Sequence, residues 1–137
     1  MKRTVFAFAR TREGIIAVRR AGETQWHFLE IEVPANEPDW RKSASQGFEN
    51  ATGVPSNPQE WDLIVSNVNQ NGSKGKKRET IYCEMRISNP KILECKRSRG
   101  KDGHQVEIVS YWKAENSFNL CKKDRDFLHV HDLLGPF

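Results

Sequence analysis

The chain has 137 residues, of which 36% are hydrophobic and 29% charged, and its formal net charge is +4. This length suits one domain with its own core, and no apolar run approaches the roughly 20 residues that a membrane helix requires, so we expect no membrane association. A net charge of this size permits an anionic partner without requiring one.

The N-terminus and the cysteines predict a cytoplasmic location. Residues 1–4 lead into an alternating segment rather than into the continuous apolar stretch of a secretory signal. The three cysteines have no C-x-x-C spacing, so neither a disulfide framework nor a zinc ribbon is indicated, and we expect reduced thiols. Cys83 alternates with Ile81, Met85 and Ile87, which predicts a packed core thiol.

The first part of the chain alternates as β-strands do. Residues 4–10 and 15–20 predict a hairpin, because two β-branched runs flank a short turn. Residues 27–33 predict a third strand that buries Leu29, Ile31 and Val33 and ends at a proline.

Residues 38–52 predict an α-helix. Its apolar residues recur at spacings of four, four and three and share one stripe: Trp40, Ala44, Phe48 and Ala51. Asp39 suits the first turn and Gly53 suits a left-handed stop, so both ends of the helix are signalled. We expect the apolar stripe to pack on the sheet.

The second half predicts further strands. Residues 61–68 and 79–88 predict a long hairpin around a basic tip at 69–78, and residues 91–99 and 105–113 predict two more strands.

A final helix is predicted within residues 124–134. The residues that define its apolar spacing are Phe127, Val130, Leu133 and Leu134, and Gly135 with Pro136 predicts its end. The order of elements predicts a single α+β domain, a mixed sheet with at least one helix on each side.

Several stretches in this order resemble a Nudix hydrolase domain, over roughly residues 3–134. "GIIAVRRAGETQW" followed by "FLEIEVPANEP" places Trp26, Val33 and Asn36-Glu37 where the family has a tryptophan, an aliphatic residue and Gly-Glu. "FENATGV" resembles the end of the family's catalytic helix, and "EIVSYW", with Trp112, resembles its late strand. The resemblance implies a Nudix-like mixed sheet between helices and a substrate in which a nucleoside diphosphate is linked to another group.

The residues that carry the family's chemistry are different here. The resemblance implies glutamates that hold divalent metals, and the matching positions are Gly47, Asn50 and Ala51. Glu49 lies about 100° away from Asn50 around the helix, Gln46 replaces the family's arginine, and the Pro-Gly-Gly turn is absent. Glycine inside a helix costs about 1 kcal/mol relative to alanine, so Gly47 indicates a close approach to the helix backbone.

Four glutamates are candidates for relocated chemistry. Glu37 and Glu49 are the candidate catalytic residues, and Glu30, Glu32, Glu37 and Glu49 are the candidate ligands of magnesium or manganese, all on condition that the domain is active. The alternative interpretation is that Glu30 and Glu32 form the solvated face of their strand.

Basic residues are candidates for binding a nucleotide or a nucleic acid. They are Arg19, Arg20, Lys76, Lys77, Arg78, Arg97 and Arg99. Trp61, Tyr82 and Tyr111 are candidates to stack on bases, if exposed. The alternative is that the basic runs are solvated hairpin tips.

The stretch "HVHD" contains His129, His131 and Asp132. In a helix His129 and His131 point about 200° apart and cannot chelate together. We therefore interpret them as surface histidines.

Three functions remain open from the sequence. The first is a degenerate Nudix-like domain that binds a nucleotide or a nucleic acid such as RNA and lacks standard pyrophosphohydrolase activity. The second is a divergent Nudix hydrolase with relocated magnesium ligands. The third is a scaffold that binds a protein partner.

Overall fold

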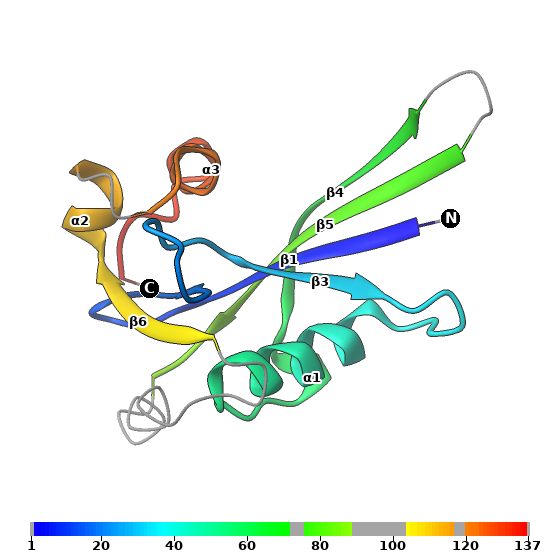
Figure 1. Cartoon of the computed structure of the whole chain (residues 1–137), viewed down its shortest axis with the longest axis horizontal. Coiled ribbons are helices and arrows are strands. Elements are labelled where there is room, and N and C mark those ends of the chain that lie inside the picture. The colour runs from blue at the N-terminus through cyan, green and yellow to red at the C-terminus, as the bar shows by residue number, and fades with distance from the viewer. Residues whose placement is uncertain (1, 72–75, 89–103, 117–119, 137) are drawn as a thin grey trace.

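The structure is a computed structural model that describes residues 2–71, 76–88, 104–116 and 120–136. A six-stranded mixed sheet lies between α1 on one face and α2 with α3 on the other (Figure 1). The strands are β1 (Lys2–Arg10), β2 (Gly14–Arg19), β3 (Leu29–Val33), β4 (Asp62–Asn71), β5 (Lys76–Arg86) and β6 (Gln105–Ser110). The helices are α1 (Trp40–Thr52), α2 (Tyr111–Asn116) and α3 (Lys122–Val130), with a 3-10 turn η1 (Pro58–Glu60). The predicted α+β architecture is confirmed.

Strand β1 lies at the centre of the sheet. The strand order is β4-β5-β1-β2-β6, with β3 also paired to β1. β1 runs parallel to β5 and antiparallel to both β2 and β3. Residues 3–7 of β1 pair with β3, whereas Ala9 and Arg10 pair with Ile16 and Ile15 of β2. β3 and β2 therefore share one edge of β1. Both predicted hairpins are confirmed, but β4 and β5 remain paired as far as Asn71 and Lys76, so the predicted tip at 69–78 is too long.

Helix α1 begins and ends as its capping residues predict. The Asp39 side chain accepts a hydrogen bond of 3.0 Å from the Arg41 amide. Gly53 has a φ of 76° and its amide donates to the Glu49 carbonyl at 2.8 Å. Ala44, Phe48 and Ala51 of the predicted apolar stripe are completely buried, and Trp40 is partly buried against the same core.

The two faces of the sheet have separate cores. The α1 face buries Val5, Leu29, Phe48, Trp61 and Cys83 among others, and the α3 face buries Phe8, Phe28, Leu120 and Leu128 among others. Cys83 is fully buried, as predicted, and this burial raises the pKa of its thiol well above the ordinary range.

Gly47 lies in direct contact with β3. A Cβ atom built on Gly47 would lie 2.8 Å from Cδ1 and 2.9 Å from Cγ1 of Ile31. The close approach that the sequence indicated is therefore made by a side chain of the same chain, and it sets how closely α1 packs on the sheet.

The predicted strand at 105–113 is too long. Strand β6 ends at Ser110, opposite Gly14, the first residue of β2, so Tyr111 has no partner in β2. The Ser110 hydroxyl accepts from the Lys113 amide at 3.2 Å, which starts α2.

The predicted end of the last helix is also wrong. α3 ends at Val130, and Asp132 adopts a φ of 55° while the Leu133 amide donates to the Leu128 carbonyl at 2.8 Å. Leu128 is therefore the buried hydrophobic residue of this helix, whereas Val130 is 75% exposed.

Some expectations fall on other parts of the chain. The strand predicted at 91–99 lies outside the described residues. Among the residues that the structure describes, no helix is both long and apolar enough to cross a bilayer.

The contact between Gly47 and Ile31 predicts opposite effects of one substitution in two backgrounds. Gly47→Ala should lower the free energy of unfolding by up to about 2 kcal/mol, because overpacking against Ile31 outweighs the gain in helix propensity. In an Ile31→Ala background the same change should raise it by about 1 kcal/mol. Urea denaturation of the four proteins measures both effects; equal effects in the two backgrounds would contradict the contact.

Candidate ligand-binding site

The face of α1 where the resemblance implies metal-binding glutamates carries no carboxylate here. Gly47 packs against Ile31, and Ala51 is completely buried in the core. Asn50 is half-buried. Divalent magnesium needs several hard oxygen ligands in near-octahedral geometry, and these residues do not supply them. Within the described ranges no three His, Cys, Asp or Glu side chains gather closely enough to hold a metal ion.

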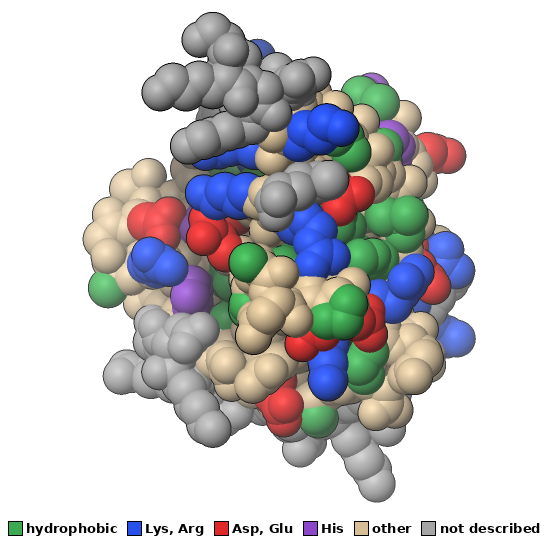
Figure 2. Space-filling view, turned by 90° about the vertical axis from the view of Figure 1, so that its right-hand side faces the viewer, with side chains coloured by type: hydrophobic (Ala, Val, Ile, Leu, Met, Phe, Trp, Pro, Cys, Tyr) green, Lys and Arg blue, Asp and Glu red, His purple; other side chains and the backbone are tan. Residues whose placement is uncertain are grey.

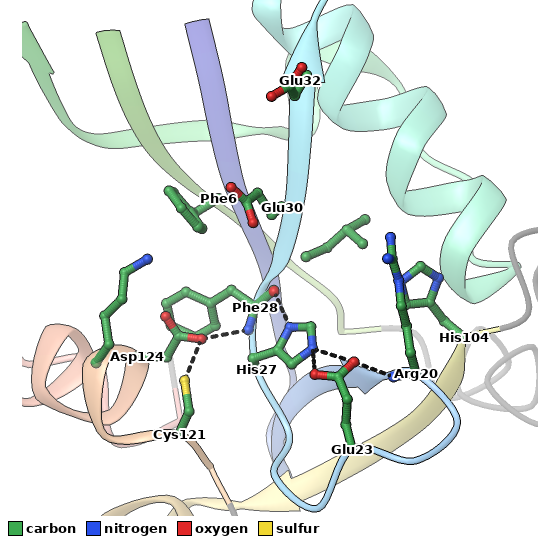
Figure 3. A pocket seen from close by; sticks show the side chains of 12 residues that line it. Phe6, Arg20, Glu23, His27, Phe28, Glu30, Glu32, His104, Cys121 and Asp124 are labelled. Atoms are coloured by element: carbon green, nitrogen blue, oxygen red, sulfur yellow. Dashed lines mark hydrogen bonds and ion pairs between the residues drawn. The ribbon is translucent and has the colours of Figure 1, made fainter. Parts of the chain in front are cut away.

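A cavity of about 570 Å³ lies on the opposite face of the sheet, towards α3 (Figure 3). It is bounded by β1, by β3 with the loop that precedes it, and by the start of α3. Its volume is within the range of 300–1,000 Å³ that is typical of small-molecule sites.

The Phe6 ring lines one side of this cavity, and further aromatic rings stack behind it. Phe6 of β1 stacks on Tyr82 of β5 with ring centres 5.0 Å apart, and Tyr82 stacks on Phe127 of α3 at 4.1 Å. The Lys123 ammonium lies 3.8 Å from the centre of the Phe6 ring. The Phe6 ring thus faces the cavity, and the exposed side chain of Lys123 covers it.

Asp124 fixes the position of α3 against the loop before β3. It is only 3% exposed, and its carboxylate accepts from the Phe28 amide at 2.8 Å and from the Cys121 thiol at 3.1 Å. Burial is the main reason that the pKa of Cys121 rises to about 11.

A second group of polar side chains forms the rim. His27 has Nδ1 2.7 Å from the Phe28 carbonyl and Nε2 3.1 Å from the Glu23 carboxylate, so both ring nitrogens face acceptors. The Arg20 side chain donates to His104 at 3.5 Å. A hydrogen bond from the Arg20 amide to Glu23 lowers the pKa of that carboxyl.

The structure brings two of the four candidate glutamates to this cavity. Glu30 and Glu32 project from β3 on the side away from α1, and both line the cavity (Figure 3). Glu32 also pairs with Lys2 at 3.0 Å. Glu37 accepts from the Asp39 amide just before α1, and Glu49 is exposed on α1; neither lines the cavity.

The candidate basic residues are dispersed. Arg20 lines the cavity, while Arg19 lies over the Trp26 ring at 4.3 Å and donates to Gln105. Lys76 begins β5, and Lys77 and Arg78 are exposed on the same strand. Arg97 and Arg99 lie outside the described residues.

The predicted stacking residues differ in exposure. Trp61 is completely buried, with its ring against Phe48 and its Nε1 donating to Ser56 at 3.0 Å, so it does not meet the condition for stacking on a base. Tyr82 and Tyr111 are half-buried. His129 and His131 are exposed at the end of α3, as the surface interpretation predicts.

Sequence reasoning missed most of the cavity. Phe6, His27, Lys123 and Asp124 line it, yet none was a candidate. The alternation of residues 4–10 placed Phe6 and Phe8 on one face of a strand, and this was the available signal.

Comparisons with known proteins show the fold alone. No family model matches the chain, and no curated protein matches it. A MutT structure from work on Aliivibrio salmonicida and Vibrio cholerae has a TM-score of 0.64 at 12% identity, with 95% of each chain covered. The C-terminal domain of mouse MUTYH, solved with human PCNA, has a TM-score of 0.62 at 9% identity, covering 96% of this chain and 88% of that one.

A further match differs in length. The chain covers 43% of a MutT/nudix family protein from Enterococcus faecalis, with a TM-score of 0.57 at 15% identity and 80% of this chain covered. Taken together, these similarities show that the protein has a Nudix-like fold.

Removal of the Asp124 carboxylate should destabilise the protein. Asp124→Ala leaves the buried Phe28 amide without its acceptor and should lower the free energy of unfolding by about 2 kcal/mol. Asp126→Ala, on the exposed side of the same helix, should change it by less than about 0.5 kcal/mol. Urea denaturation compares the two, and similar losses would show that Asp124 has no special role.

The raised pKa of Cys121 predicts slow alkylation. With a pKa of about 11, the thiolate at pH 8 is roughly 1 in 1,000 of the population, against about a quarter for an unperturbed cysteine. In a Cys95→Ser protein, iodoacetamide should therefore react with Cys121 about 200-fold more slowly at pH 8 than with a free thiol, and the rate should still rise steeply between pH 9 and 10. A rate that levels off near pH 9.5, as it does for an unperturbed thiol, would contradict the raised pKa.

Proposed function

We propose that this domain binds a nucleotide or a nucleic acid and has no standard Nudix pyrophosphohydrolase activity. The observation that carries the first half of this proposal is the cavity with the Phe6 ring in its lining. The observation that carries the second half is the contact of Ile31 with Gly47, which fills the face of α1 where the family holds its metals.

The family's chemistry needs carboxylate oxygens that converge on divalent metal ions, which neutralise a pyrophosphate and activate water. The residues at the matching positions do not fit such ions, because a hydrocarbon side chain lies against Gly47 and Ala51 has no exposed surface. A glutamate at position 47 would have to displace Ile31 from its contact. The scaffold of the catalytic helix is thus used for packing.

The cavity suits a nucleoside in size and in chemistry. A base stacked on Phe6 gains about 1–3 kcal/mol by analogy with aromatic platforms that bind single bases. Glu30 offers acceptors for exocyclic amino groups, and Lys123 and Arg20 offer positive charge for a phosphate. Lys123 needs to move from the Phe6 ring, and its exposure makes this a small cost.

A divergent hydrolase is the second candidate, because Glu30 and Glu32 line the same cavity. These two carboxylates would hold magnesium or manganese there, with Glu37 and Glu49 drawn in by a loop movement. A protein-binding scaffold is the third candidate, because the structurally similar mouse MUTYH domain was solved in complex with human PCNA.

A hydrolysis screen and a binding measurement test the proposal together. With magnesium or manganese we expect no turnover of nucleoside triphosphates, nucleotide sugars, dinucleoside polyphosphates or capped RNA. Calorimetry should detect nucleotide binding, and Phe6→Leu should weaken it about 10-fold through lost stacking. Trp112→Ala, an exposed aromatic that does not line the cavity, should leave it unchanged.

Each alternative has its own signature. Turnover that Glu30→Gln and Glu32→Gln abolish would establish the divergent hydrolase and overturn the proposal, and Glu37→Gln and Glu49→Gln would then assign the remaining ligands. Absence of both turnover and nucleotide binding would also overturn it and favour the scaffold.

A further inference from the structure

We propose that the cavity continues into a track for single-stranded nucleic acid along the open face of β1, β5 and β4. This inference rests on the proposed function and names the form of the ligand: an unpaired strand with one base in the cavity and the following nucleotides on the sheet. The track consists of two rows of side chains, defined here as Thr4, Thr80 and Asn67, followed by Lys2, Arg78 and Asn69.

The strand registers bring these residues into rows. Thr4 of β1 pairs with Thr80 of β5, which pairs with Asn67 of β4. One step further from the cavity, Lys2 pairs with Arg78, which pairs with Asn69. Directly paired residues of neighbouring strands project on the same face of a sheet.

The rows lie on the face that contains the cavity. Lys2 and Thr4 alternate in step with Phe6, and Arg78 and Thr80 alternate in step with Tyr82. The helices α2 and α3 lie at one end of this face, while β1, β4 and β5 extend beyond them (Figure 1). The side chains in both rows are exposed or half-buried, so the face beyond α3 is open.

Most of these polar side chains have no recorded partner among the described residues. Within the described part of the chain, the structure records no hydrogen bond or ion pair for the side chains of Thr4, Thr80, Asn67, Asn69 and Arg78. Lys2 pairs with Glu32, but both side chains are largely exposed, at 48% and 68%, and exposed pairs are easily exchanged. Hydroxyl and amide groups that face solvent across three strands are available for sugar and base edges.

Charge favours a polyanion at this end of the molecule. Lys2, Lys77 and Arg78 lie near the ends of β1 and β5, and Figure 2 shows Lys and Arg side chains on the surface seen from this side, with acidic side chains among them. A guanidinium suits a phosphate oxygen pair, and Arg78 has no acidic partner among the described residues.

A single strand fits better than a duplex. A base that stacks on Phe6 inside the cavity has to be unpaired, because both faces of a paired base are covered by its neighbours. Successive rows lie about 6.6 Å apart along the strands, a separation that allows one nucleotide per row. A strand would therefore meet the aromatic Phe6 ring in the cavity first. It would then meet the hydroxyl and amide groups of the first row, and finally the cationic side chains of the second row.

The length of the ligand tests the track. Fluorescence anisotropy with the full chain compares a labelled mononucleotide with strands of two, four and eight nucleotides, as RNA and as DNA. We expect affinity to rise about 10-fold or more between one and four nucleotides and to fall with salt as phosphates engage. An eight-base-pair duplex should bind more weakly than the single strands, and the difference between RNA and DNA identifies the preferred sugar.

Two variants of one strand provide a matched comparison. Arg78→Ala removes a charge from the track and should lower the affinity for the four-nucleotide strand about 5–10-fold. Lys77→Ala removes the same charge from the next residue, which projects on the opposite face, and should change it less than about 2-fold. Neither variant should alter binding of the mononucleotide.

The outcomes separate this inference from the proposed function. If the mononucleotide binds and longer strands bind no better, the track is wrong and the proposed function stands. Equal losses from Arg78→Ala and Lys77→Ala would also overturn the track, because they indicate non-specific attraction. If neither mononucleotide nor strand binds, both proposals fail.

Discussion

Strands β2 and β3 divide one edge of β1 between them, and this division shapes both faces of the sheet. β3 occupies this edge along residues 3–7 and β2 occupies it only at Ala9 and Arg10. The chain between β2 and β3 therefore has to leave the sheet and return, and it forms the rim of the cavity as it does so. On the other face, the same placement of β3 directs Ile31 into Gly47.

The buried pair of Arg10 and Glu84 holds the end of this arrangement. The Arg10 guanidinium donates to Glu84 of β5 at 2.6 Å and to the Gly135 carbonyl at 3.0 Å, and both charged side chains are less than 7% exposed. A buried ion pair of this kind is costly to break, by about 3–5 kcal/mol when one partner is removed. The contact of Arg10 with Gly135 holds the central strand β1 against the segment that follows α3. The first turn of α3 in turn carries Asp124, which lines the cavity.

Local signals in the sequence predicted α1 and most of the sheet because each signal acts within a few residues. Asp39 and Gly53 set the ends of α1, Gly47 indicated the contact with β3, and alternation placed Leu29 and Val33 in the core. Errors arose where tertiary partners decide the outcome. Tyr111 leaves the sheet because β2 has ended, and Trp61 is buried by Phe48 from α1. The cavity depends on contacts such as that of Phe28 with Asp124, which are 96 residues apart in the chain and leave no local pattern.

We propose that α1 is a packing element and that the ligand binds on the opposite face of the sheet. Amide NMR spectra recorded during titration with a nucleotide and then with manganese test this proposal residue by residue. We expect shifts at Phe6, Phe28 and Lys123 with the nucleotide, and no selective broadening of Gly47 or Asn50 when manganese follows. Selective broadening of those two α1 amides would place a metal on the helix and overturn the proposal.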